Sequence, residues 1–204
     1  MGKIDTNKKK KESSLLNTAF DFFTTKGFSK TSITDIVSQA GVAKGTFYLY
    51  FKDKYDIRNK LISHKSSQLF RTAISELEDE FCSLGFEEKI IMIIDNIVNQ
   101  LNENKSLLTF ISKNLSWGIF KNALSTPTSD DDINFTEVYN KMLEEVPYKF
   151  KSPEIMLFMI VELVSSTCYS SILYSEPCTL EQLKPNLYET IRIIINNQKN
   201  LETE

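Results

Sequence analysis

The chain has 204 residues, of which 41% are hydrophobic and 25% are charged, and its formal net charge is −3. This length suffices to bury a core without disulfides or metals, and the composition is that of a globular protein. Three cysteines, Cys82, Cys168 and Cys178, lie far apart without a CxxC pair, and His64 is the single histidine. These counts argue against a structural zinc site and a secreted disulfide scaffold. We therefore expect reduced thiols, a cytoplasmic protein, and no metal or cofactor.

The N-terminal segment and the most apolar segment bear on targeting. Residues 1–12 (MGKIDTNKKKKE) are charged, but no apolar region follows them, so we expect no signal peptide. The most apolar run, from Ile155 to Val164, has about half the length of a membrane span and continues into serines. We interpret it as a buried helix and expect no membrane partner.

Charge is distributed unevenly along the chain. Residues 1–60 contain 12 Lys and Arg against 6 Asp and Glu, whereas residues 61–204 contain 12 against 21. A basic N-terminal quarter on an acidic body is typical of a protein that binds a polyanion with one end. The lysine run at 8–11, within a basic arm over 1–12, either reaches a DNA minor groove or is a disordered solubilising tail.

Apolar residues recur at three- to four-residue spacing along nearly the whole chain, which predicts an all-α fold. Four N-terminal helices are expected. The first covers about 13–26, and the second is a short helix that is capped by Thr31 or Ser32 and ends at Gly41. The third begins at Ala43 or Lys44, and the fourth runs from Asp53 to about Phe81. Two short helices joined by a tight glycine turn beside basic charge are typical of a helix-turn-helix.

The rest of the chain also has a helical pattern. Its helices are expected at about 86–101, 106–124, 135–146, 153–175 and 180–197. The segment 125–132 (STPTSDDD) is polar and contains a proline, so we expect a loop there.

The third helix, within the stretch KGTFYLYF, has two distinct faces. At about 100° per residue, Phe47 and Phe51 share one face and have a core explanation. Leu49 points almost directly away, with Gly45 and Thr46 beside it. An outward leucine either packs against another part of the protein or meets a partner, and a DNA major groove offers such a partner surface.

The segment from Ala19 to Ile57 resembles the DNA-binding domain of the tetracycline-repressor (TetR) family. The resemblance rests on A…F…KG(F/Y) in the first helix, T(S/T)…DI(V/A)…AGV in the second, and KG(T/S)(F/L)Y.YF.(D/N)K in the third. Tyr50 departs from the pattern, since histidine is most frequent there, but tyrosine also donates to phosphate. Residues 60–204 show no matching motif.

The resemblance implies a homodimeric repressor that binds a palindromic DNA operator and is released by a small molecule. It also implies a helix-turn-helix domain over 13–58 and a helical regulatory, ligand-binding and dimerisation domain over 59–204. The DNA-contacting residues that it implies are Thr31, Ser32, Lys44, Gly45, Thr46, Tyr48, Leu49, Tyr50 and Lys54.

Two further expectations concern the body. The helices at about 153–175 and 180–197 are the dimerisation candidates, since the first is apolar on too many sides for a surface helix. A pocket for an apolar or amphipathic ligand is expected among adaptable aromatic and methionine side chains. The candidate pocket residues are Met92, Phe110, Trp117, Phe120, Tyr139, Met142, Met159, Glu162 and Tyr169.

Three other classes of function fit the sequence less well. An enzyme is disfavoured because the chain has no nucleophile elbow, Walker loop, dinucleotide fingerprint or HExxH motif. A helical protein-interaction module without ligand response is the main alternative, and the charge asymmetry and the third-helix faces count against it. A redox sensor using Cys168 and Cys178 would need activating surroundings that the sequence does not show.

Overall fold

Residues 3–75, 84–114, 117–118 and 135–200 are described by the computed structural model. Over these ranges the chain is all-α apart from two short strands, so the predicted fold class is confirmed. The elements in chain order are α1 (Lys3–Thr25), α2 (Ile33–Gln39), α3 (Lys44–Tyr48), α4 (Lys54–Ser75), α6 (Phe86–Glu103), α7 (Lys105–Asn114), α9 (Phe135–Glu144), β1 (Lys149–Phe150), α10 (Pro153–Tyr174), α11 (Leu180–Gln198) and β2 (Lys199–Asn200).

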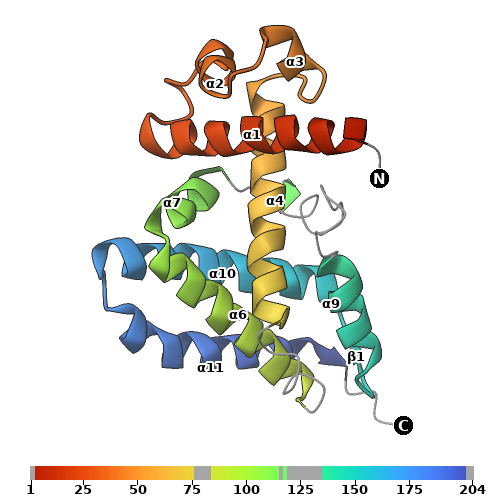
Figure 1. Cartoon of the computed structure of the whole chain (residues 1–204). Helices are drawn as coiled ribbons and strands as arrows, with labels where there is room; N and C mark the ends of the chain where they lie inside the picture. Colours follow the sequence, from red (N-terminus) through yellow and green to blue (C-terminus); the bar gives the residue numbers. More distant parts are fainter. Residues whose placement is uncertain (1–2, 76–83, 115–116, 119–134, 201–204) are drawn as a thin grey trace.

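The helices are arranged in two parts that α4 connects (Figure 1). α1, α2 and α3 form the upper part, and α6, α7, α9, α10 and α11 form the body below it. α4 has 22 residues and is therefore about 33 Å long, so it reaches from the α3 end of the molecule into the body. The predicted loop at 125–132 and the expected end of the fourth helix at Phe81 lie outside the described residues.

The first helix begins at Lys3 rather than at Ser13, which corrects the expectation of a separate arm or a disordered tail. The lysines at 8–11 lie within α1 and are exposed. Lysine is a good helix former, and no proline or glycine interrupts the segment from residue 3 to residue 25. The basic charge is therefore presented on a continuous helix.

Local sequence signals set the turn between α2 and α3. Ser32, one of the two caps that the sequence offered, is the N-cap of α2, and a reciprocal capping box joins it to Asp35. Gly41 follows α2 with φ +67°, a left-handed conformation that glycine adopts without steric cost. α3 has five residues, and Leu49 is its C-cap.

Two clusters of buried apolar side chains hold the fold together. The N-terminal cluster joins α1, α2, α3 and the first part of α4, and it includes Leu107, Phe110 and Ile111 from α7. The body cluster joins α6, α9, α10 and α11, and it includes Leu108. Adjacent residues of α7 thus belong to different clusters. The N-terminal cluster also continues along α4 to Leu69, beyond the domain boundary expected at residue 58.

The body ends in a short antiparallel contact that the sequence did not predict, in which β1 pairs with β2. The predicted bounds of α10 and α11 agree with the structure to within one residue. α10 is longer than its most apolar run, and it is the one helix of the described ranges that is long and apolar enough to cross a membrane by length and composition. Only 28% of its most apolar window is buried within the chain, and its exposed large apolar side chains are Ile155, Phe158 and Tyr174.

Candidate nucleic-acid interface and apolar cavity

The inner face of the α3 segment is formed by two aromatic rings. Phe47 is 0% exposed and Phe51 is 1% exposed, and their ring centroids lie 5.4 Å apart. Both belong to the N-terminal cluster with Leu15, Ala19 and Ile36. The sequence prediction that these rings anchor the segment is confirmed, and their burial fixes the direction of the opposite face.

The outer face of the same segment has no covering element in the described chain. Leu49 is 78% exposed and Tyr48 is 53% exposed, so the interpretation in which Leu49 packs against another part of this chain is wrong. Lys44 and Gly45 are also exposed. A Cβ atom added at Gly45 would have no neighbour within 4 Å, so another molecule can approach the backbone closely there.

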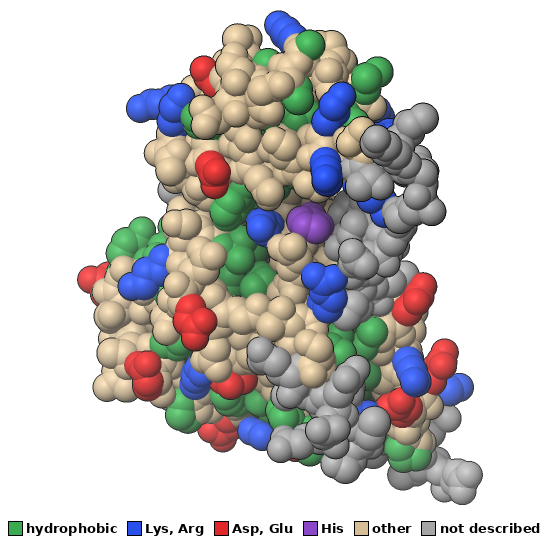
Figure 2. All heavy atoms as spheres, viewed as in Figure 1, with side chains coloured by type: hydrophobic (Ala, Val, Ile, Leu, Met, Phe, Trp, Pro, Cys, Tyr) green, Lys and Arg blue, Asp and Glu red, His purple; other side chains and the backbone are tan. Residues whose placement is uncertain are grey.

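Thr46 and Tyr50 lie at the edges of this outer face and are half-buried. Tyr50 also accepts a hydrogen bond at its backbone oxygen from Lys60 Nζ at 2.9 Å. Figure 2 shows Lys and Arg side chains on the upper part of this face of the molecule, whereas most of its Asp and Glu side chains lie on the body. We call the set Lys44, Gly45, Thr46, Tyr48, Leu49 and Tyr50 the α3 surface.

Thr31 was expected near phosphate, but the structure places its side chain in the interior. It is 1% exposed, and its hydroxyl donates to the backbone oxygen of Gly27 at 2.9 Å and to that of Phe22 at 3.3 Å. The hydroxyl is thus used to close the turn between α1 and α2, and the expectation of a phosphate contact by this side chain is corrected.

Lys54 was also expected to bind the DNA backbone, and it too is occupied within the chain. Its Nζ donates to the backbone oxygens of Phe28 at 2.8 Å and of Thr31 at 2.9 Å. The same Nζ lies 4.4 Å from the centroid of the Phe28 ring. Lys54 therefore ties the start of α4 to the turn between α1 and α2, a role that depends on residues more than twenty positions away.

Ser32 is exposed and stands at the N-terminus of α2, where its hydroxyl is shared with Asp35. The backbone N–H of Ser32 donates to Asp35 Oδ2 at 2.9 Å, and the Asp35 backbone N–H donates to Ser32 Oγ at 3.1 Å. The hydrogen bonds from the Ser32 backbone and hydroxyl hold the pKa of the Asp35 carboxyl below its ordinary value. The carboxylate form of Asp35 thus stabilises the start of α2.

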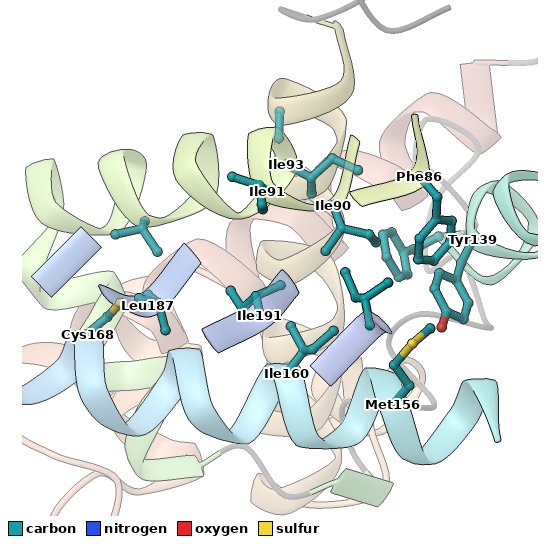
Figure 3. Packing of buried hydrophobic residues seen from close by; sticks show 14 of the residues in the cluster. Phe86, Ile90, Ile91, Ile93, Tyr139, Met156, Ile160, Cys168, Leu187 and Ile191 are labelled. Atoms are coloured by element: carbon teal, nitrogen blue, oxygen red, sulfur yellow. The ribbon is translucent and has the colours of Figure 1, made fainter. Parts of the chain in front are cut away.

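The body contains a cavity of about 130 Å³ between α4, α6, α7, α9 and α10. Its walls are mainly aliphatic. α6 contributes Ile90, Ile93, Ile94, Ile97, Val98 and Leu101. α10 contributes Leu157, Ile160, Val161, Val164, Ser165 and Cys168. Figure 3 shows side chains of these two helices, among them Ile160 and Cys168 of α10, pointing into the space between the helices.

The cavity also contacts both helices that lead to the N-terminal cluster. From α4 it is lined by Ser66, Leu69 and Phe70, and α7 contributes Leu108, Ile111 and Ser112. A molecule that fills the cavity would therefore touch the same helix that carries Lys54 at its other end.

The described lining carries no Asp, Glu, His, Lys or Arg side chain. Cys168 is its one titratable group, and burial raises the pKa of that thiol to about 11, so the thiol is neutral at physiological pH. Charges occur outside the cavity, where Tyr188 donates to Asp95 and Lys184 Nζ lies 2.6 Å from the same carboxylate. Burial raises the pKa of Asp95, but the bonds from Lys184 and Tyr188 outweigh it and lower the pKa overall.

None of the described residues proposed for a pocket from the sequence lines this cavity, which corrects that expectation. Aromatic and methionine side chains were chosen for their adaptability, but in this chain they fill the two clusters or lie near the surface. Phe110 belongs to the N-terminal cluster, whereas Tyr139 and Met142 belong to the body cluster. Trp117 packs on Phe158. Three residues are half-buried, namely Met92, Met159 and Tyr169, while Glu162 is exposed and Phe120 lies outside the described residues.

The sequence did contain a signal for the cavity. The α6 lining residues recur at positions 90, 93, 94, 97, 98 and 101, which is the spacing of one helix face. That stripe predicts an apolar face, but not whether the facing helices fill it completely.

Comparisons with known proteins agree with the N-terminal geometry. Residues 15–61 match the family model of bacterial regulatory proteins, tetR family. The fatty acid metabolism regulator protein of Bacillus subtilis is 30% identical over 87 residues, which are 43% of this chain and 43% of that protein. The HTH-type transcriptional regulator AcrR of Shigella flexneri is 36% identical over 67 residues, which are 33% of this chain and 29% of that protein. The matches thus span less than half of either relative.

Solved structures extend the likeness over the whole fold. The transcriptional regulator FadR from Bacillus subtilis, in complex with stearoyl-CoA, has a TM-score of 0.63 at 18% identity and covers 90% of this chain and 97% of its own. A TetR-family regulator from Syntrophomonas wolfei has a TM-score of 0.63 at 20% identity, with 96% and 98% covered. At these identities the likeness shows the fold alone.

A helix-turn-helix with an exposed α3 surface, mounted through α4 on a helical body, is the architecture of a transcriptional regulator. Residues 15–61 belong to the TetR family of bacterial regulatory proteins, and the whole chain shares the fold of TetR-family structures. Its named relatives are regulators rather than enzymes.

Proposed function

We propose that this protein is a homodimeric, sequence-specific DNA-binding regulator whose α3 surface reads the major groove. The observation that carries the proposal is the opposite direction of Phe47, which is 0% exposed, and Leu49, which is 78% exposed, within one short segment. Leu49 can make apolar contact with a thymine methyl group, and Thr46 can reach a base edge. Lys44 and Tyr48 stand beside them as donors to phosphate.

The second element of the proposal is a dimer formed through α10 and α11. Exposed large apolar side chains gather on these helices, namely Ile155, Phe158 and Tyr174 on α10 and Ile193 on α11. A pair of helices from each protomer would bury them in a four-helix interface. A twofold dimer presents two α3 surfaces, which fit a palindromic operator when they lie about 34–36 Å apart.

The third element is release from DNA by a small apolar or amphipathic ligand. The cavity supplies an apolar site that touches α4, and α4 carries the helix-turn-helix at its other end. The Bacillus subtilis relative of the same fold holds stearoyl-CoA, an amphipathic ligand with an apolar chain. A ligand that prefers the form with misplaced α3 surfaces would release DNA by shifting the population, which makes the protein a repressor responsive to that ligand.

Selection from a random duplex library tests this function and identifies the operator in the same experiment. We expect the wild-type protein to enrich a palindromic sequence with half-sites about one helical turn apart. Lys44→Ala should weaken binding to that sequence, whereas Lys105→Ala, which removes an exposed lysine from the body, should not. Failure to enrich any sequence would contradict the proposal that the protein binds DNA sequence-specifically. Enrichment of a single half-site would contradict the proposal of a twofold dimer.

A further inference from the structure

Two serine side chains that line the cavity make no hydrogen bond with another described residue. They belong to Ser66 on α4, which is 5% exposed, and to Ser165 on α10, which is half-buried. A third lining hydroxyl behaves differently, since Ser112 Oγ donates to the backbone oxygen of Leu108 at 2.6 Å. Serines within helices commonly bond back to the carbonyl four residues earlier in this way. Ser66 and Ser165 do not, so their hydrogen-bonding capacity is available inside the cavity.

The rest of the lining restricts the charge of anything bound there. The described side chains around the cavity are apolar except for the three serines and the neutral thiol of Cys168. An ionised carboxylate or ammonium group inside would lose its hydration and meet no charge of opposite sign on the described lining. A neutral hydroxyl or carbonyl group loses much less, because one serine hydroxyl replaces the bond to water. The electrostatics of the lining therefore select a neutral polar group.

The size of the cavity restricts the apolar part of the ligand. A cavity of about 150 Å³ lined by aliphatic and aromatic side chains binds benzene. The cavity of about 130 Å³ in this protein is similar in size and lining. It therefore accommodates about six carbon atoms without movement of its walls.

We propose that the cavity is a binding site for a neutral aliphatic molecule of about six to eight non-hydrogen atoms, whose single hydroxyl or carbonyl group hydrogen-bonds with Ser66 and Ser165. The effect of this ligand on DNA binding rests on the proposed function, whereas the ligand class follows from the lining and the size of the cavity. The two serines belong to different helices, α4 and α10. One polar group of the ligand thus connects the helix that leads to the α3 surface with a helix of the body.

Binding to the DNA-free protein tests the ligand class directly. The probes are 1-hexanol, hexanoate at pH 7.5 and benzene, measured by calorimetric titration and by the shift in unfolding temperature. We expect 1-hexanol and benzene to bind, hexanoate to bind at least about 10-fold more weakly than 1-hexanol, and 1-decanol to bind more weakly than 1-hexanol. Hexanoate binding as tightly as 1-hexanol, or no binding by any probe, would overturn the proposal.

A pair of variants tests the role of the hydroxyl. Ser66→Ala should weaken 1-hexanol about 3- to 10-fold and leave benzene unchanged, since benzene forms no hydrogen bond. Ser63→Ala is the matched control, because Ser63 lies on the same helix but does not line the cavity. The assignment would be overturned if Ser66→Ala lowered the affinities for 1-hexanol and benzene equally. It would also be overturned if Ser66→Ala and Ser63→Ala lowered the affinity for 1-hexanol equally. Selection of an operator by the ligand-free protein is measured separately, so failure of the ligand assignment is distinct from failure of the regulator.

Discussion

The ring of Phe110 in α7 meets the ring of Phe20 in α1 edge to face, with the ring centroids 5.4 Å apart. Phe110 also stacks on Phe23 at 6.3 Å. Leu108 and Ile111, beside Phe110 on α7, line the cavity. α7 therefore connects the cavity with the first helix of the DNA-binding part, and it does so independently of α4.

Replacing Phe110 with leucine is expected to weaken this connection without unfolding the protein. The leucine keeps most of the apolar volume, so the cost to the free energy of unfolding should be below about 1.5 kcal/mol. The ring contacts to Phe20 and Phe23 are lost. Operator affinity without ligand should stay within a few-fold of wild type, while the loss of affinity caused by 1-hexanol should become smaller. An unchanged ligand effect would show that α4 alone carries the coupling.

Lys54 is expected to act by positioning rather than by contact with phosphate, because its Nζ is held by the backbone oxygens of Phe28 and Thr31. Lys54→Met should lower the free energy of unfolding by about 1–3 kcal/mol, since two carbonyls lose a charged donor. Operator binding should weaken, but the slope of log affinity against log salt should stay the same.

The matched comparison is Lys44→Ala, which removes an exposed lysine from the α3 surface. A lost phosphate contact reduces the magnitude of the salt slope by about 0.9. We expect this reduction for Lys44→Ala and not for Lys54→Met, as measured by fluorescence anisotropy over a salt series. The reverse result would restore Lys54 as a phosphate contact.

The capping box of α2 predicts a dependence of stability on pH. The pKa of Asp35 is lowered in the folded protein by its bonds with Ser32, so the stabilisation is present above the ordinary carboxyl pKa, 3.8, and is lost as pH falls through the lower folded value. Asp35→Asn should therefore lower the urea midpoint at pH 7, and the difference from wild type should shrink below pH 3.8. A difference that does not change with pH would assign the effect to something other than the carboxylate.

If α10 and α11 form the dimer interface, a charged residue in place of one of their exposed apolar residues should prevent dimer formation. Ile193 is 61% exposed, so its replacement leaves the core of the single chain intact. Ile193→Lys should leave the helical content unchanged and shift the protein to monomers at micromolar concentration by light scattering, because a lysine would be desolvated in the interface. Leu49→Lys, which charges an exposed leucine outside α10 and α11, should remain dimeric. A dimeric Ile193→Lys protein would exclude this interface.

Periodicity alone predicted the faces of the α3 segment, because Phe47, Phe51 and Leu49 are placed by local helical geometry. The cap of α2 was also predicted from local sequence, as Thr31 or Ser32, and the structure has Ser32. Thr31 and Lys54 were assigned to DNA by position in a motif, but their partners Gly27 and Phe28 are set by how the chain folds back. The contact of Lys54 joins residues more than twenty positions apart, and the contact of Thr31 with Gly27, four positions away, depends on the conformation of the turn between them.

The cavity shows the same division between local and distant information. The sequence shows which face of α6 is apolar, but the space left between α6, α7 and α10 depends on how closely the helices approach. Met142 and Tyr139 looked suited to a pocket by residue type, yet they are buried within the body cluster. Residue type therefore predicted an apolar interior but not its unfilled part.

We propose that the outward side chains of the α3 surface contact DNA bases, and a single titration is a direct test of this contact. The double variant Tyr48→Ala/Leu49→Ala is titrated, as a dimer, against the operator selected by the wild-type protein and against a scrambled duplex of equal length. We expect operator affinity to fall about 10-fold or more, with affinity for the scrambled duplex nearly unchanged. Equal operator affinities for the variant and the wild-type protein would show that Tyr48 and Leu49 do not contact the bases.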